Sequence, residues 1–129
     1  MNITDEELIK SAYEAKGNAY AKYSDFHVGA ALLTRSGKVY KGCNIENSSY
    51  GATICAERTA IFKAVSEGER DFVCLAIVSD KKDATYPCGI CRQVMTEFMS
   101  KDFRIITDNC GKIEKFTLSE MLPMAFSLD

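Results

Sequence analysis

The chain has 129 residues, a length typical of one domain; 47% of them are hydrophobic and 26% are charged. This composition suits a globular protein with a buried core and is too apolar for a disordered chain. The 16 basic and 18 acidic side chains give a net charge of −2, which removes the electrostatic reason to expect nucleic acid or an anionic membrane as a partner.

No apolar run approaches the about 20 residues that a transmembrane helix needs, and the N-terminal segment lacks the basic and apolar parts of a secretory signal. We therefore expect a cytoplasmic, reducing environment. In that environment the 6 cysteines are expected to bind metal or take part in catalysis rather than to form a disulfide scaffold. The sequence has no repeat, low-complexity tract or linker, so residues 1–129 are interpreted as a single domain.

Hydrophobic periodicity and turn residues divide the chain into helices and strands. Thr4 and Glu7 form a possible capping box at the start of the first helix, and Ser36-Gly37 provides a hairpin turn. The elements expected in chain order are a helix over 4–20, strands over 28–35 and 38–44, a loop over 45–54, a helix over 55–67, a strand over 72–79, a helix over 88–99, strands over 103–107 and 113–116, and a short helix over 118–122.

This order of elements predicts an α/β fold. Strand–helix–strand units place the strands over 38–44, 72–79 and 103–107 in one sheet, with antiparallel strands added at both edges. Helices on both faces complete a three-layer α/β/α sandwich around a mixed five-stranded sheet. The pattern leaves the strand order open.

Three cysteines lie at the starts of two predicted helices: Cys55 opens one, and Cys88 and Cys91 open the other. Side chains three residues apart in a helix are separated by about 60°, so Cys88 and Cys91 can share a ligand. A helix N-terminus lowers the pKa of a thiol toward the thiolate form that binds metal. Three protein ligands and an open fourth position are typical of a catalytic zinc site.

Glu57 follows Cys55 by two residues, which is about 200° around a regular helix. Both side chains can still face one point if Cys55 is the non-helical residue that caps the helix. The alternative is that Glu57 only complements the helix dipole in the first turn. The spacing alone does not decide between these two interpretations.

Two non-catalytic interpretations of the cysteines also remain open. A thiol redox protein predicts a disulfide between Cys88 and Cys91 and no metal. A zinc-stapled binding module needs a fourth protein ligand, which Cys43 or Cys110 can supply. Cys74 lies within the apolar run over 72–78 and is expected to be a small core residue.

The motif Cys55-Ala56-Glu57, followed by Pro87-Cys88-Gly89-Ile90-Cys91, resembles the signature of zinc deaminases, in which H-x-E or its cysteine variant precedes P-C-x-x-C. The chain is similar to the cytidine deaminase family, and within it to the short, homotetrameric class with three zinc cysteines. The similarity extends from Ala19 to Phe126. The matching blocks cover residues 23–32, 44–47, 55–60, 87–93 and 122–126.

This resemblance implies one Zn²⁺ per chain, held by Cys55, Cys88 and Cys91. It implies the hydrolytic deamination of free cytidine and 2′-deoxycytidine in pyrimidine salvage, and a homotetramer whose sites are completed by neighbouring subunits. Zinc must activate water for this reaction, and one carboxylate must move protons to and from the pyrimidine. We assign that carboxylate to Glu57.

The resemblance also assigns substrate-binding roles to six residues. Asn44 and Glu46 correspond to residues that hold the ribose 3′-hydroxyl, and Phe26 to one that packs on the pyrimidine. The backbone N–H of Ala56 is similar to the group that binds the base carbonyl. Tyr50 and Phe126 correspond to side chains that reach the site of a neighbouring subunit.

Three thiolates carry more negative charge than zinc carries positive charge, so a positive group must offset them. The helix N-termini contribute to this offset. Arg58 follows Cys55 by three residues, and the resemblance implies that it hydrogen-bonds the thiolates; Arg92 is a weaker candidate. Blasticidin S deaminase shares the zinc cysteines and the equivalent of Glu57, and is the alternative enzyme, although residues 44–47 and 55–60 look like cytidine deaminase.

Overall fold

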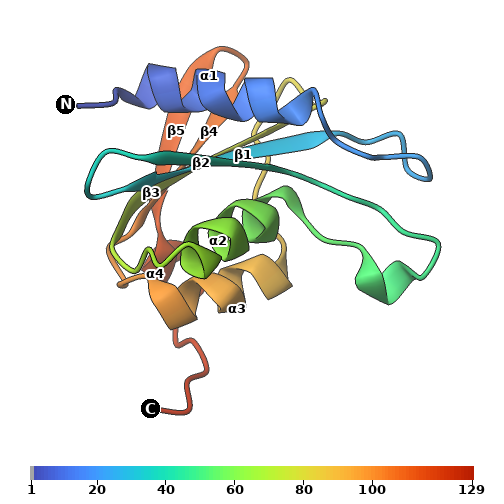
Figure 1. The fold of residues 1–129 in the computed structure, drawn as a ribbon. Helices are drawn as coiled ribbons and strands as arrows, with labels where there is room; N and C mark the ends of the chain where they lie inside the picture. Colours follow the sequence, from blue (N-terminus) through green and yellow to red (C-terminus); the bar gives the residue numbers. More distant parts are fainter. Residues whose placement is uncertain (1) are drawn as a thin grey trace.

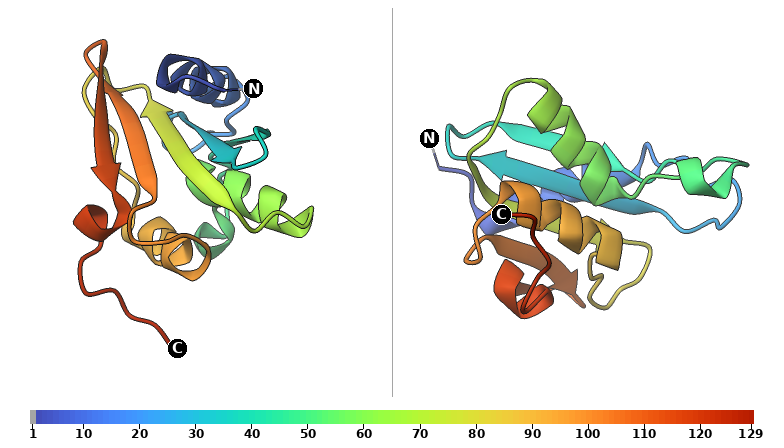
Figure 2. Two further views of the ribbon diagram at one scale, coloured as in Figure 1. Left: turned by 90° about the vertical axis from the view of Figure 1, so that its left-hand side faces the viewer. Right: turned by 90° about the horizontal axis from the view of Figure 1, so that it is seen from below.

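The computed structural model describes residues 2–129, in which a mixed five-stranded sheet lies between helices on both faces (Figure 1). Helix α1 covers one face, and α2 and α3 lie together on the other (Figure 2). The predicted three-layer α/β/α sandwich is therefore confirmed. The elements in chain order are α1 (Asp5–Lys16), β1 (Val28–Thr34), β2 (Val39–Cys43), the short 3₁₀ turn η1 (Tyr50–Ala52), α2 (Ala56–Ser66), β3 (Phe72–Ser79), α3 (Gly89–Phe98), β4 (Arg104–Asn109), β5 (Lys112–Thr117) and α4 (Leu118–Met121).

The strands lie in the order β2-β1-β3-β4-β5, with β3 and β4 parallel and the other neighbours antiparallel. Antiparallel strands thus form both edges, as predicted. The sequence left the strand order open, and the structure places β2 at the edge and β1 inside the sheet. The inner place suits β1 because Ala30, Ala31 and Leu32 are buried on both of its faces, whereas β2 exposes Lys41.

The first helix begins with the predicted capping box. The Thr4 side chain accepts a hydrogen bond from the Glu7 amide (3.1 Å), and the Glu7 carboxylate accepts one from the Thr4 amide (3.0 Å). The helix ends at Lys16 and not at the predicted residue 20. The reason is that the Tyr20 amide already donates to the Asn44 carbonyl (2.9 Å), which ties this segment to the loop after β2.

Two apolar clusters fill the spaces between the layers. The prediction that Cys74 is a core residue is confirmed, and Met95 and Met99 are buried as well. None of the helices within residues 2–129 is long and apolar enough to cross a membrane. The cluster beneath α1 contains Leu8, Ile9, Ala12, Ala31, Cys74, Ala76, Val78 and Ile106, and the cluster beneath α2 and α3 includes Leu32, Ile61, Leu75, Ile77, Met95 and Ile105.

Asp5, in the first turn of α1, ties this helix to β4 and β5. Its carboxylate lies 3.1 Å from Arg104 Nη2 and 3.3 Å from Lys115 Nζ. The hydrogen bond from Arg104 holds the pKa of Asp5 below its usual range, although partial burial acts in the opposite direction. A lowered pKa in the folded state stabilises the fold above the pKa of the unfolded carboxyl, and that stabilisation is lost as the pH falls through the folded-state value.

We expect Asp5→Asn to lower the free energy of unfolding at neutral pH by about 0.2–1 kcal/mol, because the ion pairs are partly exposed to solvent. The difference between Asp5→Asn and the parent chain should shrink as the pH falls below about 3.9, the pKa of a free Asp. Urea unfolding at several pH values measures this difference. A difference that stays constant down to low pH would contradict the role given to the ionised carboxylate.

Candidate active site

Three sulfur atoms from two helix starts meet at one point. Cys55 is the N-cap of α2 and Cys88 is the N-cap of α3, while Cys91 lies in the first turn of α3. The Sγ atoms of Cys55 and Cys88 are 3.5 Å apart, those of Cys88 and Cys91 are 3.4 Å apart, and all three lie within 4.8 Å of one another. Neither N-cap cysteine forms a side-chain capping hydrogen bond, so both thiols are available to a shared ligand.

This sulfur cluster fits a tetrahedral zinc ion. Zn–S bonds of about 2.3 Å place sulfurs about 3.8 Å apart in a tetrahedral site, close to the observed separations. All six cysteines are free, so no disulfide joins Cys88 to Cys91. Within residues 2–129 no further histidine, cysteine, aspartate or glutamate joins the group, and neither Cys43 nor Cys110 is part of it. Three protein donors are the number found in catalytic zinc sites, whereas structural sites have four.

The surroundings of Cys55 favour negative charge on its sulfur. Hydrogen bonding from Cys91 and the nearby Arg58 lower the pKa of Cys55 to about 5, although burial acts in the opposite direction. The same hydrogen bond and burial raise the pKa of Cys91. The guanidinium Nη2 of Arg58 donates a hydrogen bond to Cys55 Sγ over 3.6 Å. This is the contact that the resemblance to the cytidine deaminase family implied. The cluster therefore attracts a cation.

Arg92 donates its hydrogen bonds to backbone carbonyls. Its Nε donates to the Pro87 carbonyl and its Nη1 donates to the Met121 carbonyl, each over 2.7 Å. The side chain therefore ties the segment before Cys88 to α4. Two nitrogens of the Arg92 guanidinium thus donate to backbone carbonyls, whereas Arg58 donates to a sulfur, which agrees with Arg92 being the weaker of the two candidates.

Glu57 lies in the first turn of α2 and is only 3% exposed. Burial raises its pKa to about 7; the charge on Cys55 acts in the same direction, while hydrogen bonding from Cys91 and from the Cys88 backbone partly offsets both. The carboxyl group is therefore turned toward the sulfurs and away from solvent. Because Cys55 is the non-helical cap, the two side chains can face one point despite their spacing. Ala56, fully buried between them, starts the helix with an N–H that has no partner within the helix.

Asn44 organises the loop that carries Phe26. Its Oδ1 accepts a hydrogen bond from the Val28 amide (2.9 Å), and its Nδ2 donates to the Phe26 carbonyl (2.8 Å). Asn44 is almost fully buried, while the Phe26 side chain remains 37% exposed. The side chain of Asn44 thus fixes the backbone on both sides of His27.

Glu46 holds the preceding part of the same loop. Its Oε1 accepts hydrogen bonds from the Tyr23 amide (2.9 Å) and the Ser24 amide (3.0 Å), and its Oε2 accepts one from the Ser24 hydroxyl. The hydrogen bonds from Ser24 lower the pKa of Glu46. The carboxylate borders a surface hollow of about 360 Å³, whose lining residues are Tyr23, Ser24, Glu46, Asn47, Tyr50 and Thr53.

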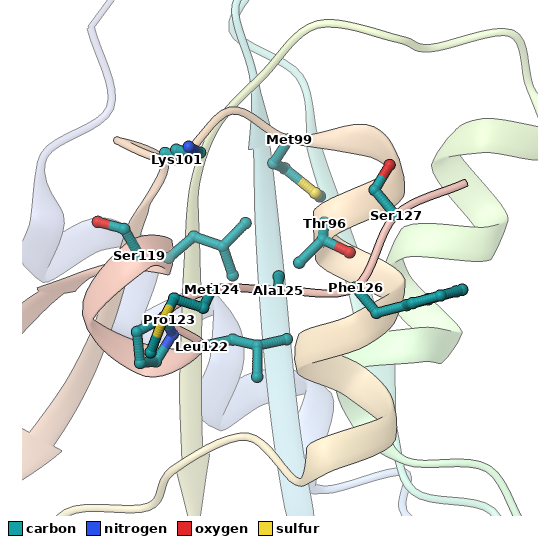
Figure 3. Close-up of a pocket in the computed structure, with 11 residues that line it drawn as sticks. Thr96, Met99, Lys101, Ser119, Leu122, Pro123, Met124, Ala125, Phe126 and Ser127 are labelled. Carbon is teal, nitrogen blue, oxygen red and sulfur yellow. The ribbon is translucent and has the colours of Figure 1, made fainter. Parts of the chain in front are cut away.

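Tyr50 and Phe126 lie on the surface, 81% and 67% exposed, and not among the sulfurs. The carbonyl of Phe126 accepts a hydrogen bond from Gln93 Nε2 (3.0 Å), which holds the C-terminal segment against α3. Phe126 borders a pocket of about 460 Å³ between α3, α4 and this segment, and its ring points away from Leu122 and Met124 (Figure 3). None of the zinc-binding candidates lines this pocket.

Two supporting residues were not predicted from the sequence. The Thr59 hydroxyl lies within hydrogen-bond distance of the Cys43 carbonyl (3.0 Å) and the Cys55 carbonyl (3.1 Å). The Asp80 carboxylate accepts from the His27 amide (2.8 Å) and lies 2.7 Å from His27 Nδ1, so it anchors the loop of Phe26 from the end of β3. A lone Thr in a helix and a lone Asp after a strand carry no motif that reveals such contacts. His27 itself is half-buried and not part of the cysteine cluster.

Comparisons with known proteins agree with this geometry. Residues 2–107 match the family described as the cytidine and deoxycytidylate deaminase zinc-binding region. A protein named cytidine deaminase from Halalkalibacterium halodurans is 54% identical over 123 residues, which cover 95% of this chain and 93% of that protein. The crystal structure of cytidine deaminase from Burkholderia pseudomallei matches with a TM-score of 0.92 at 44% identity, covering 96% of this chain and 100% of that one.

A blasticidin-S deaminase from Bacillus cereus is a more distant relative, 34% identical over 95% of this chain and 92% of that protein. The higher identity to the Halalkalibacterium protein extends over an equal share of this chain, so the alternative enzyme is not favoured. With a family match over most of its length and a structural match over nearly all of it, the chain belongs to the zinc-binding cytidine and deoxycytidylate deaminase family.

Proposed function

We propose that this chain catalyses the zinc-dependent hydrolytic deamination of cytidine and 2′-deoxycytidine to uridine and 2′-deoxyuridine, with release of ammonia. The observation that carries this proposal is the group of three free sulfurs at the starts of α2 and α3, with the buried carboxyl of Glu57 directed toward it. Two relatives that are 54% and 51% identical to this chain bear the name cytidine deaminase.

Cys55, Cys88 and Cys91 hold the zinc ion in this proposal. When bound, zinc supplies a water whose pKa is lowered to about 7 and which can then attack C4 of the pyrimidine. Glu57 accepts the proton that this water loses and donates a proton to N3 as C4 is attacked. It then takes the proton of the new C4 hydroxyl and passes it to the amino group, so that the C4–N bond breaks, ammonia leaves and the carbonyl of uridine forms. A carboxyl whose burial raises its pKa to about 7 suits both halves of this proton transfer.

The substrate is bound by groups that retain hydrogen-bonding capacity. An amide nitrogen has two donors, and Asn44 uses one of them on the Phe26 carbonyl. A carboxylate offers about four acceptor sites, and Glu46 uses three of them. One remaining donor and one remaining acceptor can bind both ends of the ribose 3′-hydroxyl. Phe26 packs on the pyrimidine, and the N–H of Ala56 binds the base carbonyl.

The active form in this proposal is a homotetramer in a reducing, cytoplasmic compartment, serving pyrimidine salvage. Tyr50 and Phe126 reach the site of a neighbouring subunit, and their large exposed areas leave both rings available for such a contact. Six free cysteines suit a reducing environment. Residues 1–129 act as a single domain; residue 1 lies outside the described residues. Light scattering of the zinc-loaded protein tests the tetramer, and a monomeric mass would exclude it.

Arg58 is expected to matter for both zinc retention and turnover. Its guanidinium faces the sulfur of Cys55, so removing it leaves the charge of three thiolates without this offset. Arg58→Ala should fold, lose zinc more readily and turn over cytidine more slowly, on the order of tenfold to a hundredfold, the typical cost of removing a partner of a metal ligand. Metal analysis and steady-state kinetics measure the two effects, and Arg70→Ala, an exposed arginine after α2, is the control.

A direct assay tests the proposed function itself. Zinc-loaded protein is mixed with cytidine, conversion to uridine is followed by ultraviolet absorbance, and released ammonia is measured in parallel. We expect one ammonia for each uridine formed, and a lower rate with blasticidin S as substrate. Zinc-loaded protein that leaves cytidine unchanged would refute the proposal and favour a non-catalytic zinc module.

A further inference from the structure

The first turn of α2 lies directly on strand β2, at a point where no side chain fits. A Cβ atom on Gly42 would lie 2.4 Å from the Ala56 carbonyl oxygen, 2.5 Å from the Ala60 amide nitrogen and 3.0 Å from the Ala60 Cβ. This oxygen and this nitrogen are the acceptor and donor of an i to i+4 pair in the first turn of the helix. The contact is therefore made by backbone atoms, which cannot move aside as the end of a flexible side chain can.

Thr59 holds the same turn from the next position. Its hydroxyl lies 3.0 Å from the carbonyl of Cys43, the strand residue after Gly42, and 3.1 Å from the carbonyl of Cys55, the helix cap. One side chain thus connects the end of β2 to the residue that supplies a sulfur. Close contact at Gly42 and this connection by Thr59 fix α2 both in distance from the strand and in position along it.

The other two sulfurs are placed by different contacts. Cys88 and Cys91 belong to α3, and the segment before this helix is held by Arg92 through the Pro87 carbonyl. The distance between Cys55 and the α3 sulfurs therefore depends on where each helix rests on its own support. A shift of α2 away from β2 moves one corner of the sulfur cluster and leaves the other two in place.

We propose that Gly42 and Thr59 are positioning residues for the zinc site: they set the place of Cys55, and with it Glu57, relative to Cys88 and Cys91. Neither residue belongs to the group of proposed zinc ligands. This role rests on zinc binding by the three cysteines and is independent of which nucleoside is the substrate. Zinc binding by the parent chain is measured first, so a failure of the zinc site and a failure of this proposal are distinguishable.

Gly29 provides a matched control on the neighbouring strand. A Cβ atom on Gly29 would lie 2.0 Å from the Ala12 carbonyl oxygen and 2.6 Å from the Lys16 amide nitrogen, so it also meets the backbone of a helix. That helix is α1, on the opposite face of the sheet and without any zinc-binding candidate. Gly29→Ala and Gly42→Ala therefore introduce the same methyl group against helix backbone, but only one of these helices carries Cys55.

The test compares the zinc-loaded parent chain, Gly42→Ala and Gly29→Ala. Zinc release to an excess of a colorimetric chelator is timed, the absorption spectrum of the cobalt(II)-substituted protein is recorded, and the thermal midpoint is measured. We expect both variants to lower the midpoint, but only Gly42→Ala to release zinc about tenfold faster or more and to change the cobalt spectrum. Equal release from both variants, or unchanged release from Gly42→Ala, would overturn the proposal.

Thr59→Val keeps the test decisive if Gly42→Ala does not fold, because it removes a hydroxyl without adding bulk. We expect Thr59→Val to release zinc several-fold faster than the parent chain. Thr96→Val is its control, since within residues 2–129 the Thr96 hydroxyl bonds only to the side chain and the carbonyl of Gln93, one turn earlier in the same helix. Release from Thr59→Val at the parent rate, or equal acceleration in Thr96→Val, would exclude a positioning role for this contact.

Discussion

Replacing Glu57 by glutamine should leave a folded protein that binds zinc and nucleoside but deaminates cytidine about a thousandfold more slowly or worse. The amide is close in size to the carboxyl, so the buried position of this side chain is preserved. It cannot accept a proton from water or deliver one to N3 and the leaving amine. Loss of proton transfer accounts for most of the expected decrease, and a less well oriented attacking water adds to it.

The measurements for Glu57→Gln are the zinc content, the affinity for a nucleoside and the turnover number. Glu97→Gln is the matched control, because Glu97 is an exposed glutamate on the helix that carries two of the cysteines. We expect normal turnover from Glu97→Gln. Near-normal turnover from Glu57→Gln, with normal zinc content, would end the assignment of Glu57 as the proton carrier.

Replacing one of the three zinc-binding cysteines should reduce turnover at least as much as Glu57→Gln does. Cys91 is fully buried and belongs to the cluster that the starts of α2 and α3 form. Removal of a partner that only orients a metal ligand costs about 10–100-fold in affinity, so loss of a ligand must cost more. We expect purified Cys91→Ser to contain far less than one zinc per chain and to show no measurable deamination.

Cys110→Ser is the control for this variant, since Cys110 lies outside the cluster. Its zinc content and turnover should equal those of the parent chain. Stripping the parent chain with a chelator should abolish activity, and added zinc should restore it; the same addition should not restore Cys91→Ser. Full zinc occupancy in Cys91→Ser would show that the metal is held elsewhere.

The local features of the fold were readable from the sequence because short-range interactions determine them. The capping box formed by Thr4 and Glu7 begins α1 as predicted. The predicted turn at Gly37, which has a positive φ of 95°, joins β1 to β2. The end of α1 and the inner place of β1 were not readable in this way. Both depend on contacts between distant segments, such as the pairing of β1 with β3.

At the active site, too, short-range features could be predicted from the sequence, whereas contacts between distant segments could not. The helix starts at Cys55 and Cys88 were predicted from periodicity, but the sequence left open whether Cys55 is the non-helical cap that lets Glu57 face the sulfurs, and the structure places it there. What the sequence did not reveal is how much of Asn44 and Glu46 is used to hold the loop of Phe26, because these hydrogen bonds join residues that are far apart in the sequence. The contact between Gly42 and the first turn of α2 was hidden for the same reason.

X-ray absorption at the zinc edge of the purified protein tests the central claim most directly, since it counts the atoms around the metal by type. Zinc held by Cys55, Cys88 and Cys91 predicts three sulfur neighbours at about 2.3 Å and one lighter neighbour at about 2.0–2.2 Å. A shell of four sulfurs, or one with only two, would contradict the three-sulfur site on which the proposed chemistry depends.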